Sequence, residues 1–124
     1  MELLLINREA VQALHDAVLN PNELAGLAGD KSLDAVMGRV ENRLTYGLIE
    51  DVFDLAATYA VVLAVGHVFN DGNKRTAFTV MDICLVQNGV VPRYEVIEAA
   101  DMIIRAAQQM LDEKELAQWL RRRG

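Results

Sequence analysis

A stretch of twelve residues, 66–77, holds most of the side chains that could do chemistry in this 124-residue chain. It reads Gly-His-Val-Phe-Asn-Asp-Gly-Asn-Lys-Arg-Thr-Ala, so an imidazole, a carboxylate and two cations lie close together. The segments on either side, 55–65 and 77–86, are strongly apolar and are predicted to be buried helices. A polar loop between buried helices must direct its polar groups toward water or a ligand, because burying them unpaired is unfavourable. The loop is therefore the first candidate for a functional site.

The order of residues after Asp71 indicates a binding site for phosphate. Asp71-Gly72-Asn73 is typical of a turn, and Gly72 allows the backbone to approach a bound group closely. A helix that starts near Asn73 presents unpaired N–H groups and a positive dipole end, although Asn73 could also serve only as its cap. The next two residues are cations where helices ordinarily carry acids, which a bound anion explains. The predicted phosphate-binding residues are Gly72, Asn73, Lys74 and Arg75.

Two further side chains supply what phosphoryl or nucleotidyl transfer needs besides a phosphate site. His67 could take the proton of an attacking hydroxyl. Asp71 could hold a magnesium ion that bridges the phosphates, or it could merely shape the turn. Lys74 and Arg75 could likewise be solvated surface cations. The sequence contains no zinc-type Cys/His cluster, G-x-S-x-G motif or Walker A loop, so any phosphate chemistry must use residues 67–75.

Residues 67–75, His-Val-Phe-Asn-Asp-Gly-Asn-Lys-Arg, resemble the central motif of the Fic/Doc family, and most closely its Doc (death-on-curing) branch of toxins. Related features extend to residues 14–16 and 24–40. The resemblance implies an all-α domain that binds ATP and Mg²⁺ at the motif loop, with His67 as the catalytic base and Asp71 as the metal ligand. It also implies a flap just before the central helices that positions the target, for which the candidates are Thr45, Tyr46 and Gly47.

The motif departs from the pattern of Fic adenylyltransferases at two positions. Those enzymes have glycine where Lys74 stands and a second arginine where Phe78 stands. Because the Doc branch shows the pattern found here, the resemblance implies transfer of the γ-phosphate of ATP to a threonine of elongation factor Tu, which arrests translation. The alternatives are an adenylyltransferase with the same fold and a non-catalytic member that binds only a nucleotide or a partner.

Many Fic proteins carry an inhibitory helix of the form Ser/Thr-x-x-x-Glu-Gly/Asn, and this sequence contains no such pattern. The resemblance therefore implies inhibition in trans. The expected partner is a small antitoxin whose disordered tail folds onto an exposed apolar groove.

The composition fits one domain spanning residues 1–124, with 52% hydrophobic residues to form a core. The net charge of −6 argues against nucleic acid as the main partner. Cys84 is the only cysteine, which excludes an internal disulfide and fits a reducing compartment. The longest apolar run, 55–65, is far shorter than the roughly 20 residues that span a bilayer, so we expect a cytoplasmic chain without a membrane segment.

Periodicity and capping residues predict about six helices in a single compact all-α domain. They span Asn7 to about Leu19, Ser32 to about Arg43, Asp51 to Gly66, about Asn73 to Asn88, Arg93 or Tyr94 to about Met110, and Asp112 to the triple arginine. Leu44 to Glu50 is predicted to be a loop, and Gly66 the residue that ends the third helix. His15 and Asp16 are interpreted as structural or supporting residues. Asp82, in an apolar helix, is expected to need a partner such as an arginine.

Overall fold

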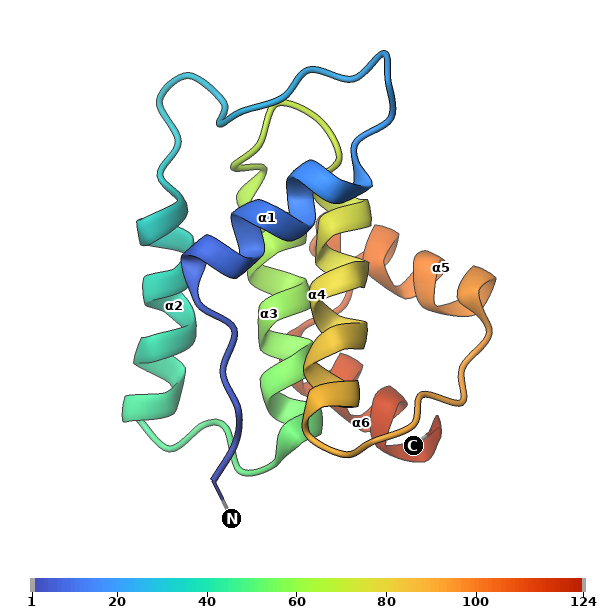
Figure 1. Cartoon of the computed structure of the whole chain (residues 1–124). Coiled ribbons are helices and arrows are strands. Elements are labelled where there is room, and N and C mark those ends of the chain that lie inside the picture. The colour runs from blue at the N-terminus through green and yellow to red at the C-terminus, as the bar shows by residue number, and fades with distance from the viewer. Residues whose placement is uncertain (1, 124) are drawn as a thin grey trace.

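The computed structural model describes residues 2–123 as a bundle of six helices (Figure 1). They are α1 (Arg8–Val18), α2 (Leu33–Thr45), α3 (Val52–Gly66), α4 (Asn73–Gln87), α5 (Val96–Ala107) and α6 (Glu113–Arg123). No β-strand occurs in this part of the chain, apart from one isolated antiparallel bridge between Leu27 and Phe69. The predicted all-α class is confirmed.

The central element is α3, because it is apolar on every side. Its residues from Leu55 to Ala64 are all buried, and the helix packs against α4, α6, α5 and α2. The next helix, α4, runs antiparallel beside α3, while α1 crosses in front of both (Figure 1). This arrangement places the loop between α3 and α4, which carries the polar motif, at one end of the bundle.

The predicted capping residues begin three of the helices. Asn7 accepts a hydrogen bond from the Ala10 amide at 2.9 Å, and Asp51 accepts one from the Asp54 amide, also at 2.9 Å. Ser32 does the same for α2. A side-chain oxygen that pairs a free N–H group of the first turn stabilises a helix by about 1 kcal/mol.

Two helices have boundaries that differ from the prediction. The second helix, α2, continues to Thr45, and α5 is shorter than expected at both ends. Tyr94 lies outside α5, and its hydroxyl donates a hydrogen bond to Asp82 at 2.7 Å, so the partner of Asp82 is a tyrosine rather than an arginine. Gln109 ends the helical region in the left-handed conformation, with φ of 59°.

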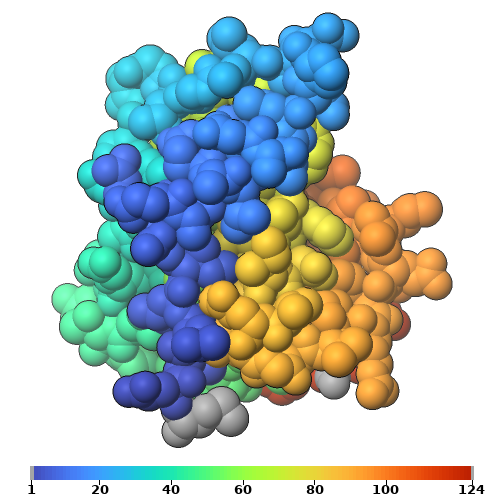
Figure 2. Space-filling model, in the orientation of Figure 1, coloured from blue at the N-terminus to red at the C-terminus, as the bar shows by residue number. Residues whose placement is uncertain are grey.

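The long connection between α1 and α2, residues 19–32, runs over the end of the molecule where α3 and α4 are joined (Figures 1 and 2). Within residues 2–123, none of the helices has the length and apolar character needed to cross a lipid bilayer.

Candidate active site

The motif loop forms a cleft of about 380 Å³ between the end of α3 and the start of α4. It brings together all the predicted catalytic, metal-binding and phosphate-binding residues, with two additions, Glu23 and Asn70. The cleft is lined by Glu23, His67, Asn70, Asp71, Gly72, Asn73, Lys74 and Arg75.

His67 ends α3 and adopts the left-handed conformation, with φ of 46° and ψ of 43°. The helix ends at Gly66, as predicted, but Gly66 is its last helical residue rather than the C′ residue. A Cβ atom on Gly66 would lie only 2.9 Å from a methyl of Val36, so the glycine is needed for α2 to pack against α3. The imidazole of His67 is exposed and makes no hydrogen bond to any other described residue, so it is available to a substrate.

Asn73 holds the loop closed through both ends of its side-chain amide. Its Oδ1 accepts the Phe69 N–H at 3.0 Å, and its Nδ2 donates to the Phe69 carbonyl at 2.9 Å. Phe69 itself is buried, which anchors the loop in the core. Asn73 is therefore the first residue of α4 rather than its cap, and only its backbone N–H remains for a ligand.

The N-terminus of α4 is open. Its N-cap is Gly72, with φ of 78°, which provides no capping side chain, and the first turn contains no acid. Among residues 2–123, no acceptor pairs with the N–H groups of residues 72–75. These amides, at the positive end of the helix dipole and beside the exposed Lys74, form a site suited to an anion.

Arg75 is held in an ion pair that the sequence did not reveal. Its guanidinium donates to both carboxylate oxygens of Glu23, at 2.6 and 2.9 Å, and to the Val18 carbonyl at 2.9 Å. The hydrogen bond from Arg75, with help from the Asn20 amide, lowers the pKa of Glu23 to about 2. Any anion that reached Arg75 would therefore share its guanidinium with a carboxylate that is ionised at neutral pH.

The predicted flap residues Thr45, Tyr46 and Gly47 lie elsewhere. They end α2 and precede α3, whereas His67 follows α3. The whole length of α3, about 22 Å for 15 helical residues, therefore lies between them along the chain. The connection from α2 to α3 and the loop from α3 to α4 lie at opposite ends of the bundle (Figure 1). This position does not suit a flap over His67. The assignment relied on nearness along the chain, but the chain passes through the whole length of α3 before it reaches the motif.

The segment that does lie beside the motif is residues 23–28. The Ala28 N–H donates to the Val68 carbonyl at 2.8 Å, and the Asn70 N–H donates to the Gly26 carbonyl at 3.0 Å. This short antiparallel pairing also places two exposed leucines, Leu24 and Leu27, next to the cleft. No strand-like alternation in residues 23–28 signalled the pairing in the sequence.

The carboxylate of Asp71 has one oxygen in a hydrogen bond that holds the loop, and the other is free to bind a metal ion. Its Oδ2 accepts the Leu24 N–H at 2.7 Å, which leaves Oδ1 without a hydrogen bond to the described residues. Magnesium in phosphate-transferring sites commonly takes one or two carboxylates, with phosphate oxygens and water as the other ligands. One free carboxylate oxygen beside the uncapped start of α4 fits that pattern, although no group of three or more His, Cys, Asp or Glu side chains in residues 2–123 is placed to hold a metal ion.

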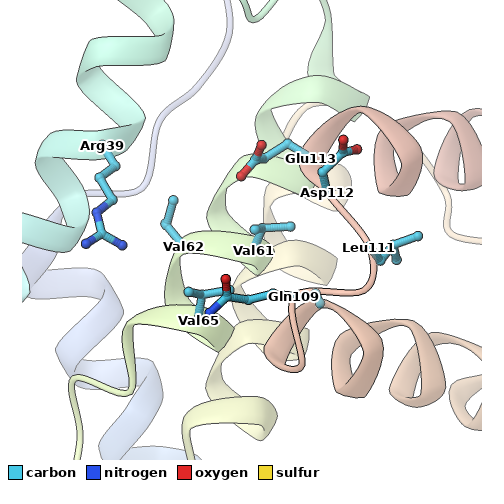
Figure 3. Close-up of a pocket in the computed structure, with 9 residues that line it drawn as sticks. Arg39, Val61, Val62, Val65, Gln109, Leu111, Asp112 and Glu113 are labelled. Atoms are coloured by element: carbon cyan, nitrogen blue, oxygen red, sulfur yellow. The ribbon is translucent and has the colours of Figure 1, made fainter.

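A second hollow, of about 320 Å³, lies on another side of α3 (Figure 3). Its floor is apolar, formed by Val61, Val62 and Val65, and Arg39 and Glu113 lie on its rim. It offers neither an exposed imidazole nor an uncapped helix start. The motif cleft, unlike this hollow, has both features.

Comparison with known proteins agrees with this geometry. Residues 5–85 match the sequence profile of the Fic/DOC family. The chain is also 39% identical over 118 residues to the protein kinase doc of Escherichia phage P1, an alignment that covers 94% of this chain and 93% of that protein. On both grounds, the chain belongs to the Fic/DOC family.

Proposed function

We propose that the chain is a Doc-like toxin that transfers the γ-phosphoryl group of ATP to a hydroxyl of a protein target. The observation that supports this most directly is the single cleft in which an exposed imidazole lies beside four unpaired backbone amides. The similarity to a protein kinase of phage P1 supports the same reaction class. The proposed target is a threonine of elongation factor Tu, with arrest of translation as the consequence.

In the proposed reaction, the phosphates of ATP lie against the start of α4. The N–H groups of residues 72–75 and the ammonium of Lys74 hold phosphate oxygens and stabilise the charge of the transition state. The hydroxyl oxygen of the target forms a bond to the γ-phosphorus while the bond from that phosphorus to the bridging oxygen breaks, and ADP leaves. His67 takes the hydroxyl proton.

Asp71 is the residue that would hold Mg²⁺ with the phosphates. The metal would supply neutralisation of phosphate charge when bound. The contact between Asp71 and the Leu24 amide keeps this carboxylate at the edge of the cleft.

The second candidate reaction is transfer of AMP to the same kind of hydroxyl. The structure provides one observation against it, at Phe78, where Fic adenylyltransferases have an arginine. The Phe78 ring packs edge-on against Tyr94, with centroids 6.2 Å apart, so this position contributes an aromatic contact and no cation. Parallel reactions with α-labelled and γ-labelled ATP separate the two, because only phosphoryl transfer moves the γ-label to protein.

Substitution of His67 tests the proposed base. His67→Asn keeps a side chain that tolerates the left-handed conformation but cannot accept the proton, so transfer of the γ-label is expected to fall by about a hundredfold to ten-thousandfold. Thermal unfolding serves as the control and is expected to stay close to that of the unchanged chain. Transfer at the original rate by a folded His67→Asn protein would rule out His67 as the base.

The proposed partner is an antitoxin that binds in trans, since the sequence contains no Ser/Thr-x-x-x-Glu-Gly/Asn helix. Growth arrest on expression of the chain alone, relieved by co-expression of a neighbouring small gene product, is the expected behaviour. No arrest by a folded and soluble chain would argue for the non-catalytic alternative.

A further inference from the structure

The α1 helix contributes an ionisable side chain that the proposed reaction does not use. His15 is completely buried, and its ring stacks on Phe69 with centroids 3.7 Å apart and planes 7° from parallel. A buried imidazole requires hydrogen-bond partners, because leaving its nitrogens unpaired would be costly. Its partner is part of the motif loop.

The Nε2 atom of His15 lies 2.7 Å from the carbonyl oxygen of Asp71. A carbonyl can only accept, so Nε2 must carry a hydrogen and donate it to Asp71. The other ring nitrogen, Nδ1, lies 3.3 Å from the exposed carboxylate of Asp16, which is a longer and more solvated contact. The short bond to the Asp71 carbonyl is thus the main polar contact of the ring.

That carbonyl belongs to the peptide that precedes Gly72. The peptide is trans, so its C=O and N–H groups point in opposite directions. Because the Asp71 carbonyl points toward His15, the Gly72 N–H points away from His15. Like the N–H groups of residues 73–75, it has no acceptor among residues 2–123. The orientation of one peptide therefore decides whether the first group of the anion site is a donor or an acceptor.

Gly72 cannot fix that orientation by itself. Glycine adopts φ near 78° and negative φ with similar ease, so the Asp71–Gly72 peptide can rotate at little steric cost. The neighbouring contacts through the Asp71 carboxylate and the Asn73 side chain do not touch this carbonyl. Within residues 2–123, only His15 donates a hydrogen bond to it.

We propose that His15 is a positioning residue: its Nε2–H holds the Asp71–Gly72 peptide so that the Gly72 amide, and not the Asp71 carbonyl, faces the phosphates of the nucleotide. The role in binding rests on the proposed function, whereas the orientation of the peptide does not. Without the donor, the peptide is free to rotate and to present an oxygen to an anion.

Two substitutions separate this role from simple packing. His15→Phe keeps a flat ring against Phe69 but removes the donor, and His15→Gln loses the ring but keeps an N–H at about the same reach. Asp16→Asn is the matched control, because it changes only the exposed contact to Nδ1.

The first measurement is ¹⁵N relaxation dispersion of the Gly72 amide in the free protein, which requires no nucleotide. The His15→Phe protein is expected to show exchange between two states at Gly72, and the His15→Gln and Asp16→Asn proteins are expected to show one state. The second measurement is the Kd for ATP with Mg²⁺ by equilibrium dialysis. His15→Phe is expected to weaken binding by about tenfold, the usual effect of losing one hydrogen bond to a charged group, while His15→Gln stays within about threefold.

The proposal is overturned if His15→Phe leaves both the Gly72 signal and the Kd unchanged. It is also overturned if His15→Gln weakens binding as much as His15→Phe, since the ring alone would then matter. A chain that binds no ATP, yet shows the difference at Gly72 between the two variants, would refute the proposed function and leave the role of His15 in orienting the peptide intact.

Discussion

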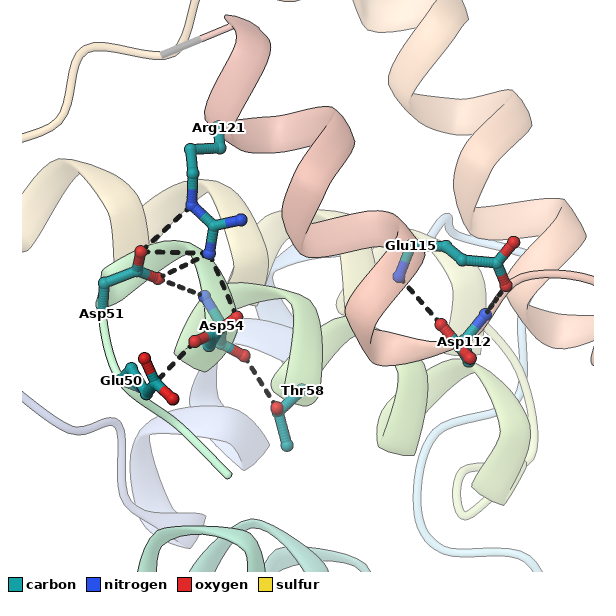
Figure 4. A network of polar contacts seen from close by, with 7 residues as sticks. All are labelled: Glu50, Asp51, Asp54, Thr58, Asp112, Glu115 and Arg121. Atoms are coloured by element: carbon teal, nitrogen blue, oxygen red, sulfur yellow. Dashed lines mark hydrogen bonds and ion pairs between the residues drawn. The ribbon is translucent and has the colours of Figure 1, made fainter. Parts of the chain in front are cut away.

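The starts of α3 and α4 lie at opposite ends of the bundle and are built in opposite ways. At the start of α3, Asp51 accepts the Asp54 N–H, and Asp54 accepts the Glu50 N–H at 3.0 Å. Arg121 of α6 then pairs with both carboxylates, at 3.0 Å from Asp51 and 3.2 Å from Asp54 (Figure 4). The chain itself satisfies this helix end, with acids at the positive pole and an arginine to balance them.

At the start of α4 the chain supplies no cap, no acid and two cations, Lys74 and Arg75. Both helices have 15 residues and share the core, so neither length nor burial explains the contrast. The difference indicates that the start of α3 is arranged for stability and the start of α4 for an external anion. Exchanging features between the two ends tests this interpretation.

Among substitutions at the two helix starts, the largest effect on ATP binding is expected from Lys74→Glu, which gives α4 an acidic first turn like that of α3. The acid favours the helix dipole and is expected to stabilise the fold by about 0.3–1 kcal/mol. The same change replaces a cation with an anion at the proposed phosphate site, so the Kd for ATP is expected to rise by about a hundredfold. Urea unfolding and equilibrium dialysis measure the two effects on the same protein.

Lys74→Gln is the control, because it removes the cation without adding an acid. It is expected to weaken ATP binding by about tenfold and to leave the unfolding free energy nearly unchanged. Unchanged ATP binding by the glutamate variant would show that this helix start does not hold phosphate.

A smaller effect on the Kd for ATP is expected from Glu23→Gln. Removing the carboxylate frees Arg75 and removes a negative charge from the cleft, so ATP is expected to bind up to about fivefold more tightly. Weaker binding would instead show that Glu23 orients Arg75 for the phosphate. The Kd for ATP with Mg²⁺ distinguishes the two outcomes.

The same variant tests the ion pair through pH. Arg75 lowers the pKa of Glu23 from 4.5 to about 2, so the pair stabilises the fold above pH 4.5, and this contribution is lost as the pH falls through about 2. The unchanged chain is therefore expected to lose stability relative to Glu23→Gln between those two values. Urea unfolding at pH 6 and at pH 2 measures the difference, which is expected only at the higher pH.

The smallest effect on the reaction is expected from Asp51→Ala, at the other helix start. It removes the cap of α3 and one partner of Arg121, which is expected to lower the unfolding free energy by about 1 kcal/mol, since the half-exposed ion pair adds little. Transfer of the γ-label per folded molecule is expected to stay unchanged. A loss of transfer without a loss of stability would mean that the two ends of α3 are coupled.

Much of the fold could be predicted because the signals for a helix, capping residues and apolar periodicity, lie within the helix's own stretch of sequence. Asn7 and Ser32 are good caps that precede amphipathic segments, and both begin helices in the structure. The motif loop was predicted for a similar reason, since its residue types and order lie within one short stretch. The roles of its individual residues in binding and catalysis remain predictions.

The features that could not be predicted from the sequence depend on contacts between segments that are far apart in the chain. Glu23 lies in an irregular segment, and nothing near it along the chain indicates a pairing with Arg75, 52 residues away. The pairing of residues 23–28 with the motif is equally non-local. The sequence carried a weak signal for His15. It lies four residues after the buried Val11, on the same face of α1, so its burial and its need for a hydrogen-bond partner could have been predicted.

The left-handed backbone at His67 has an evolutionary consequence. A residue with a Cβ atom in that conformation costs roughly 1 kcal/mol, and glycine avoids most of this cost. With His67 as the proposed base, its substitution by glycine is expected to stabilise the fold and to abolish the reaction. In a lineage without selection for the reaction, genetic drift is expected to replace this histidine early. Its retention in a population would therefore indicate that the reaction is under selection.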